Sequence, residues 1–253
     1  MGQKTLNQEC LIETARYRVR FARGPDDVAR AQALRAQLFR GAAGFSDADR
    51  FDPLCSHLLV EDRETGAVVC TFRMLGLPDG GRIGESYAAQ FYGLAPLGGY
   101  TGRMLEIGRF CIAPEARDAD VLRLAWAALT RIVAAEGIEL LFGCSSFPGT
   151  DEAAFLDTFA LLKDRHIAPR KWLPRVKAPD VFRFARVLRR APDLKQAQKA
   201  MPPLLRSYLA MGGWVSDHAV RDRDLGTLHV FTGLEVGQVP PGRRRALTAL
   251  AGG

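Results

Sequence analysis

The sequence predicts a mixed α/β fold, with a β-sheet that carries helices on both of its faces. Two observations lead to this prediction. Strand-like segments alternate along the chain with segments whose apolar residues recur at helical spacing. Between residues 105 and 147 the order is strand, helix, strand, which implies a crossover connection and a locally parallel arrangement.

The first half of the chain shows one clear pattern per element. Y-R-V-R-F-A alternates at period two, which is typical of a strand with one buried face. The stretch that follows spaces its apolar residues three and four apart, as an amphipathic helix requires. Two apolar runs flank R-E-T-G and favour an antiparallel hairpin. The expected elements are a strand at 17–22, a helix at 25–40, a loop at 41–53, and strands at 56–62 and 67–75.

The second half begins with an irregular stretch rich in Gly, Tyr and Phe. L-E-I-G-R-F-C-I-A-P then has the apolar content of a buried strand, and the amphipathic helix after it closes on a glycine C-cap. The expected elements are an irregular segment at 78–102, strands at 105–114, 138–147 and 225–236, and helices at 121–137, 151–162 (capped by Thr150) and 202–213.

Composition places the chain among globular proteins, since 47% of the residues are hydrophobic and 25% are charged. We expect a single domain over residues 1–253, with a flexible tail at 241–253. The sequence has no apolar run of the roughly 18 residues that span a bilayer and no signal-peptide pattern, so the expected location is cytoplasmic. Five cysteines without a C-x-x-C pair and four scattered histidines predict no metal site.

The positive charge is concentrated in a proline-punctuated basic segment at 165–199. This segment holds eleven Lys or Arg against two acids, a net charge of +9, whereas the whole chain carries +7. A nucleic-acid-binding module is one interpretation of so basic a segment, but no DNA- or RNA-binding motif accompanies it. A solvated basic face without any partner is another.

Glu106 and Arg109 stand inside the apolar decapeptide at 105–114. On a regular strand Glu106 and Gly108 would point to one side and Arg109 to the other, which makes both charges costly to bury. A bulge at Gly108, or a cleft where strands separate, would remove this cost, and both features are associated with active sites. The alternative is a structural ion pair without a catalytic role.

Further polar residues stand where a ligand could reach them. Asp47, Asp49 and Asp52 lie in the loop at 41–53, where three carboxylates suit an amino-bearing substrate or simply cap a solvated turn. Arg73 lies within an apolar strand and needs a partner or an opening. Ser145 and Ser146 end a strand, at the edge of the sheet where α/β proteins bind ligands.

The motifs, in order and spacing, resemble those of one enzyme family. R-A-Q-L-F, F-D-P-L-C-S-H-L-L-V-E-D, C-T-F-R-M-L, L-E-I-G-R-F-C-I-A-P, F-G-C-S-S-F-P-G-T-D and P-P-L-L-R-S-Y-L-A-M-G-G are similar to segments of the bacterial ornithine lipid N-acyltransferases. These enzymes belong to the GNAT superfamily and are related to the acyl-homoserine-lactone synthases. The resemblance covers roughly residues 17–236 and implies a GNAT-like sheet that is splayed at its centre.

The resemblance also implies a reaction. A 3-hydroxyacyl group would pass from acyl carrier protein to the α-amino group of L-ornithine, giving lyso-ornithine lipid. Glu106 would act as general base and Arg109 would orient it. No metal, bound cofactor or covalent acyl-enzyme is required. The residues that would surround the substrates are Arg35, Asp49, Asp52, Arg73, Ser145 and Ser146.

The expected acyl donor is a carrier protein, because the stretch before the helix at 121–137 has no glycine to cradle a pyrophosphate. It presents Glu115, Asp118 and Asp120 instead, which disfavours CoA. Carrier proteins are acidic, so the basic segment offers a complementary surface, and anionic phospholipid at the inner membrane is a second expected contact. The expected docking residues are Arg170, Lys171, Arg175, Arg186, Arg189 and Arg190.

Two related activities stay open at this point: an acyl-homoserine-lactone synthase, and an acyltransferase for another amino acid such as glutamine. Ser56 stands where many relatives of this family are expected to carry aspartate, so the amino substrate is not settled by the motifs.

Overall fold

The computed structural model describes residues 10–41, 46–116 and 119–252. These residues form two compact units. The first is drawn from Met1–Leu75, Ile107–Gly137 and Pro241–Gly253, and the second from Gly76–Glu106 and Ile138–Pro240. Strands β4 (Val68–Leu77) and β6 (Arg103–Ile112) each contribute residues to both units.

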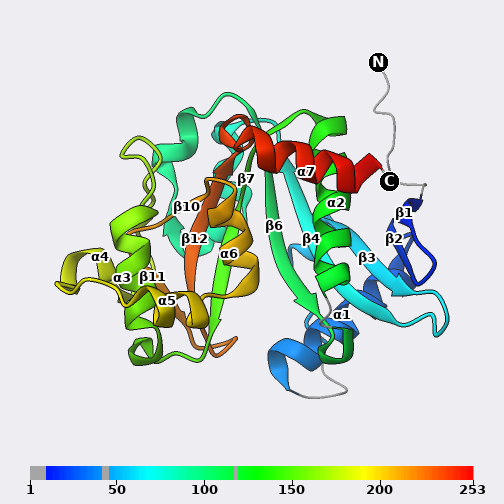
Figure 1. Ribbon diagram of the computed structural model, residues 1–253, viewed down its shortest axis with the longest axis horizontal. Helices are drawn as coiled ribbons and strands as arrows, with labels where there is room; N and C mark the ends of the chain where they lie inside the picture. The colour runs from blue at the N-terminus through cyan, green and yellow to red at the C-terminus, as the bar shows by residue number, and fades with distance from the viewer. Residues whose placement is uncertain (1–9, 42–45, 117–118, 253) are drawn as a thin grey trace. The chain divides into compact units, whose positions relative to one another are not determined.

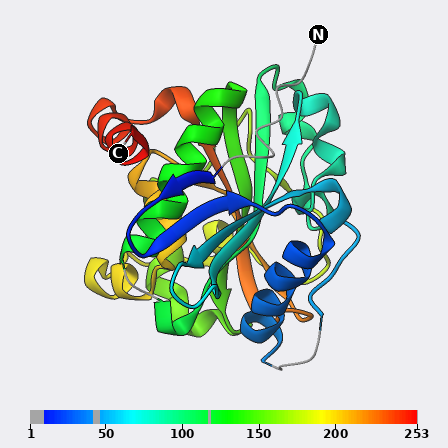
Figure 2. The ribbon, with the colours of Figure 1, turned by 90° about the vertical axis from the view of Figure 1, so that its right-hand side faces the viewer.

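The first unit contains a sheet in the order β1-β2-β3-β4-β6, in which successive strands from β1 to β4 pair antiparallel. Figures 1 and 2 show α1 and α2 on opposite faces of this sheet. Helix α7 packs against α2 and occupies the segment for which a flexible tail is predicted. The other elements are β1 (Cys10–Glu13), β2 (Tyr17–Phe21), α1 (Pro25–Arg40), η2 (Asp52–Leu54), β3 (Ser56–Asp62), η6 (Pro114–Ala116), α2 (Ala119–Glu136) and α7 (Pro241–Gly252).

Helix α1 has the sequence signals of a helix at both ends. Proline opens its first turn, where a missing N–H costs nothing, and Asp26 and Asp27 follow in that turn, where the helix dipole favours negative charge. Gly41 ends the helix at φ 66°, a left-handed conformation that glycine adopts without strain. The buried face of α1 includes Arg35, a charged residue among alanines and a leucine.

The second unit contains the strand order β6-β7-β12-β11-β9, with β10 paired to β12. Its longest pairing joins β7 to β12, antiparallel, from Leu140 opposite Glu235 to Pro148 opposite Thr227. A separate two-stranded sheet pairs β5 with β8. The elements are η3 (Gly80–Glu85), η4 (Ala88–Gln90), β5 (Tyr92–Gly93), η5 (Ala95–Gly99), β7 (Ile138–Pro148), η7 (Glu152–Phe155), α3 (Leu156–Arg165), β8 (Arg175–Val176), β9 (Val181–Phe182), α4 (Phe184–Val187), α5 (Leu194–Ala200), α6 (Pro203–Ala210), β10 (Trp214–Val215), β11 (Ala219–Asp222), β12 (Thr227–Glu235) and η8 (Val236–Gln238).

A phenylalanine cluster forms the core under α3. Phe147, Phe155, Phe159 and Phe184 are buried together, with ring centroids of successive partners 5.0–5.1 Å apart. Phe184 belongs to the basic segment, so this segment is tied to the core by an apolar anchor although its arginines face outward. Such burial is the main force that holds a surface segment in place.

The predicted fold class, a GNAT-like mixed α/β sheet with flanking helices, is confirmed. The single-domain organisation and the central splay stay predictions. The expected cap Thr150 is wrong: Asp151 accepts the N–H of Ala153 at 2.9 Å, because its carboxylate reaches the first turn from the N-cap position. Within the described residues, no helix has the length and apolar character needed to cross a membrane.

Candidate active site

The loop before β3 is held by alternating charges in the first unit. Arg35 on α1 donates from Nε to Asp47 Oδ2 at 2.9 Å and from Nη1 to Asp52 Oδ1 at 2.8 Å. Arg73 on β4 donates to Asp49 at 2.6 and 2.8 Å and to Asp52 at 2.7 Å. Asp49 is the most exposed of these side chains, at 23%, and the others are buried.

Arg109 on β6 closes this arrangement. Its Nε donates to Asp47 Oδ2 at 2.8 Å, and its Nη2 donates to Asp49 Oδ2 at 3.2 Å. Each of three aspartates therefore bridges two of three arginines, and each arginine bridges two aspartates. We call these six residues the charge ring: Arg35, Asp47, Asp49, Asp52, Arg73 and Arg109.

The ring keeps Asp49 and Asp52 ionised, because both carboxyl groups have a lowered pKa. Burial alone would raise the pKa of Asp52, but the hydrogen bonds from Arg35 and Arg73 hold that pKa well below its ordinary value. Burial likewise opposes the charge on Arg73, yet its pKa is raised by Asp49 and Asp52. The ring thus fixes the loop against two strands and one helix by paired charges.

The ring also limits which aspartate a substrate can reach. The side chain of Asp49 is 23% exposed, whereas those of Asp47 and Asp52 are 1% and 5% exposed. Contact between a cationic substrate and Asp49 stays a prediction that this geometry permits. The same contact at Asp52 would compete with two arginines that already bind its carboxylate.

Strand β6 has an irregular backbone at Arg109, one residue after the position that the sequence predicts. Arg109 has φ 52°, in the left-handed region that non-glycine residues rarely adopt, and it is alone in this among the described non-glycine residues. The sequence predicts the irregularity at Gly108. A left-handed residue interrupts the regular alternation of side chains along a strand. At Arg109 this backbone conformation goes together with a side chain that binds Asp47 of the charge ring.

Glu106 lies in the second unit, and a short helix holds its carboxylate. The backbone N–H of Tyr87 donates to Oε2 and that of Ala88 donates to Oε1, both at 2.8 Å. These two donors begin η4, so the glutamate caps a helix in addition to any catalytic role. Arg109 contacts Asp47 and Asp49, and its orientation of Glu106 stays a prediction.

Ser145 and Ser146 point to opposite faces of β7 because side chains alternate along a strand. Ser145 is buried and its hydroxyl accepts a hydrogen bond from Thr232 Oγ1 at 2.9 Å. Ser146 is exposed. The structure therefore does not place both hydroxyls on the same side, and their roles in substrate binding stay predictions.

Comparison with known proteins decides the family. Residues 31–127 match the acetyltransferase (GNAT) domain. The L-ornithine N(alpha)-acyltransferase of Rhodobacter capsulatus is 36% identical over 230 residues, which are 85% of this chain and 88% of that protein. This chain belongs to the L-ornithine N(alpha)-acyltransferase family. The protein of the same name from Brucella abortus is 30% identical over 87% of this chain and 85% of its own length.

A solved structure shares the fold of this family member. An N-acyl amino acid synthase from uncultured soil microbes superposes with a TM-score of 0.53, covering 94% of this chain and 99% of that one at 11% identity. The matched GNAT domain at 31–127 contains the whole charge ring and Glu106. The basic segment at 165–199 lies outside that match.

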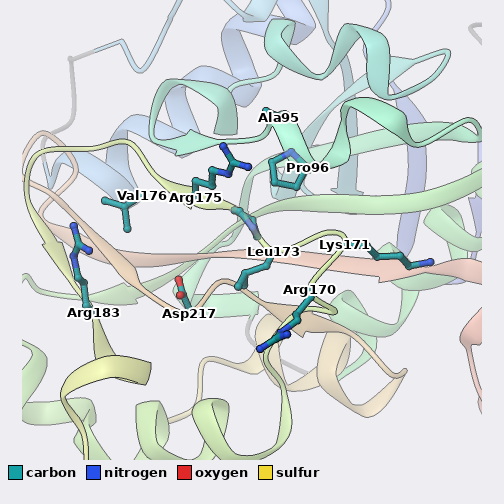
Figure 3. Close-up of a pocket in the computed structure, with 10 residues that line it drawn as sticks. Ala95, Pro96, Arg170, Lys171, Leu173, Arg175, Val176, Arg183 and Asp217 are labelled. Atoms are coloured by element: carbon teal, nitrogen blue, oxygen red, sulfur yellow. The ribbon is translucent and has the colours of Figure 1, made fainter.

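The expected docking residues of the acyltransferase fall into two groups. Arg170, Lys171 and Arg175 line a pocket in the second unit (Figure 3). The others are exposed on and after α4, where Arg190 forms an ion pair with Asp157 at 2.5 Å. Of the acidic stretch expected to disfavour CoA, Asp118 lies outside the described residues, and Asp120 pairs with Arg123.

Buried histidines of the second unit were missed by the sequence analysis. The hydroxyl of Tyr92 lies 3.0 Å from His229 Nδ1, and His218 Nδ1 lies 2.7 Å from Asp217 Oδ1. Burial lowers the pKa of His229 to about 3, and nearby His218 adds to this effect. No local sequence pattern predicts the contact between Tyr92 and His229, because these residues are 137 positions apart.

Proposed function

We propose that this protein transfers a 3-hydroxyacyl group from acyl carrier protein to the α-amino group of L-ornithine, giving lyso-ornithine lipid. The observation that carries this proposal is the 36% identity, over 85% of the chain, to a protein named L-ornithine N(alpha)-acyltransferase. Support also comes from the charge ring and Glu106, which lie within the stretch that matches the GNAT domain.

In the proposed reaction the α-nitrogen of ornithine attacks the thioester carbonyl carbon. An N–C bond forms, the C–S bond breaks, and the proton lost by the amine passes to the leaving thiolate. An α-amino group has a pKa of about 8 and is largely protonated near neutral pH, so a base must first accept a separate proton from the ammonium form to give the neutral amine. Glu106 takes this role, directly or through a water. Its two backbone hydrogen bonds hold the carboxylate in one orientation.

The charge ring would support the reaction from the loop before β3. Asp49, its most exposed acid, would attract the cationic side chain of ornithine. Arg109 and Arg73 would hold Asp49 in position through their hydrogen bonds. The ring accordingly acts as a positioning device, with Asp49 as its contact to substrate.

The acyl donor and the membrane would meet the basic segment. Val187 and Leu194 are 54% and 47% exposed, and Arg186, Arg189 and Arg190 lie between or beside them. Apolar side chains among cations suit the surface of an anionic membrane, and the cations alone suit an acidic carrier protein. We place the enzyme in the cytoplasm, in contact with the inner membrane where its lipid product is released.

The test is product formation by the purified protein. 3-Hydroxyacyl carrier protein is incubated with ornithine, glutamine, lysine or S-adenosylmethionine, and products are identified by mass. The proposal predicts N-acyl-ornithine, with fragmentation placing the acyl group on the α-nitrogen. Acyl-glutamine or an acyl-homoserine lactone as the main product would contradict it. A parallel reaction with the matching acyl-CoA tests the donor and should give far less product.

The base is tested by Glu106→Gln, which keeps the shape of the side chain and removes its charge. We expect kcat to fall by about 10²-fold or more, as is typical when a general base is lost. Glu64→Gln, the same change in the exposed hairpin turn, should leave kcat unchanged. Full activity of the Glu106 variant near neutral pH would refute the base assignment while leaving the proposed reaction standing.

A further inference from the structure

A pocket of about 640 Å³ lies in the second unit, beside the small sheet formed by β5 and β8. Residues of the turn at 170–174 and of η5 form its walls, and Arg183, Val176 and Asp217 complete it. In Figure 3 Arg183 and Asp217 extend in the same direction, Arg175 extends toward Pro96, and Lys171 points away from them. The pocket is separate from Glu106 and from the charge ring in its lining residues.

The arginines of this pocket lack acidic partners within the described residues. Arg170, Arg175 and Arg183 take part in no ion pair there. Other arginines of the same unit do: Arg221 and Arg223 both bind Asp180. Three guanidinium groups without counter-charges around one cavity create a site with a positive potential.

The single acid of the pocket is already engaged. Asp217 Oδ1 lies 2.7 Å from Nδ1 of His218, whose side chain is buried. With Lys171, whose side chain points away, the lining residues comprise four cations and one carboxylate, a formal charge of +3. A phosphate group presents several oxygens that share its negative charge, and planar guanidinium groups bind such oxygens in pairs, so this excess of cations suits a phosphate.

The remaining lining is apolar. Ala95, Pro96, Leu173, Pro174 and Val176 supply carbon surface next to the charged groups. Such a surface binds the carbon chain of a ligand and gives no hydrogen bonds to a bare ion. The ligand that fits is therefore a phosphate group with an organic arm.

We propose that this pocket binds a phosphate ester. Two sources share this chemistry: the phosphopantetheine arm of the acyl donor, which rests on the proposed function, and the glycerol phosphate of a phospholipid headgroup, which does not. In either case the arginines bind the phosphate, whereas Pro96, Pro174 and Leu173 contact the carbon arm.

The test is calorimetric titration at fixed ionic strength, without ornithine and without acyl transfer. The probes are 4′-phosphopantetheine, with pantetheine as its phosphate-free partner, and sn-glycerol 3-phosphate, with glycerol as its partner; inorganic phosphate is the bare anion. The proposal predicts that at least one ester binds, more tightly than inorganic phosphate, and that its phosphate-free partner does not. Binding of phosphopantetheine alone assigns the donor, and binding of glycerol phosphate alone assigns the lipid.

Variants localise the binding. Arg183→Gln and Arg175→Gln should each raise the Kd of the bound ester by about tenfold or more, the loss of one charge-assisted hydrogen bond. Arg186→Gln is the matched control: it removes the same charge from the same short segment, is exposed, and does not line the pocket. It should leave Kd unchanged. Thermal unfolding midpoints verify that the exposed substitutions leave the fold intact.

Three results would overturn the proposal. One is that neither ester binds. Another is equal binding of the bare anion, which removes the role of the apolar wall. The third is equal weakening by Arg186→Gln, which indicates general charge attraction. None of these results bears on ornithine acylation, because the product assay reads the transfer reaction and these titrations do not.

Discussion

Removal of Arg35 tests whether the charge ring stabilises the fold. Its side chain is 1% exposed and donates to two aspartates that are themselves buried. In Arg35→Met, Asp47 keeps Arg109 and Arg40, but the buried Asp52 keeps only Arg73 of its two arginine partners. Breaking a buried ion pair from one side typically costs about 3–5 kcal/mol, since the remaining charge stays buried.

The magnitude can be read from thermal unfolding. For a chain of about this size, 1 kcal/mol shifts the unfolding midpoint by about 2–4 °C, so Arg35→Met should lower it by about 6–20 °C. Differential scanning calorimetry measures this shift directly. The control is Arg82→Met, which breaks an ion pair with Glu85 whose side chains are 59% and 50% exposed. Solvent screens an exposed pair, so that midpoint should move by a few degrees at most.

The pH dependence gives the ring a second signature. The pKa of Asp52 is depressed in the folded state, so its contribution to stability is complete above its ordinary pKa of 3.8 and is lost as the pH falls toward the folded value. Arg35→Met weakens this depression, so the stability difference between the variant and the natural protein should shrink below about pH 4. A midpoint shift of Arg35→Met no larger than that of Arg82→Met, or one that is constant from pH 7 to pH 3, would refute the reasoning.

Two further predictions concern the backbone of β6 and the buried histidine. Arg109→Gly should be more stable than Arg109→Ala by about 1 kcal/mol in urea unfolding, because both lose the ion pairs but only glycine is free of strain at φ 52°; equal stabilities would show that the backbone relaxes. As the pH falls from about 6.5 toward 3, the unfolded chain protonates His229 while the fold keeps it neutral, so stability should fall by up to about 1.4 kcal/mol per pH unit. His229→Gln should flatten this slope in the same urea measurements, and an unchanged slope would assign it to other groups.

Two separate sets of partners explain why the decapeptide at 105–114 tolerates two charges. Glu106 and Arg109 serve different partners: the glutamate holds a short helix, and the arginine holds the loop before β3. Arg109, which has the left-handed backbone conformation, lies in β6, a strand that contributes residues to both units. An ion pair between Glu106 and Arg109, the alternative without a catalytic role, is not needed to account for either side chain.

Much of the fold follows from local pattern. The helix expected at 25–40 is Pro25–Arg40, and the hairpin around R-E-T-G is β3 and β4. These segments announce themselves because periodicity, capping residues and turn residues act over a few positions. The strands β9, β10 and β11 escaped prediction, since each has only two to four residues and depends on the pairing with β12 or β11.

The candidate site divides in the same way. Local patterns singled out Asp47, Asp49, Asp52, Arg73 and Arg109, because a charge within an apolar or glycine-bounded stretch is a local anomaly, and the family resemblance added Arg35. They did not reveal that these residues bind one another around a ring, nor that Arg183 and Asp217 join Arg170 and Arg175 at one pocket.

The sequence by itself therefore determined the fold class, the family and the residue types of the site, since these reside in short patterns and their order. Only the tertiary structure decided the pairing of charges, the reach of Asp49 and the pocket of unpaired arginines. These features depend on side chains that lie close in space although some are more than a hundred positions apart in the sequence. They also depend on the backbone angle φ of Arg109, which no local pattern specifies.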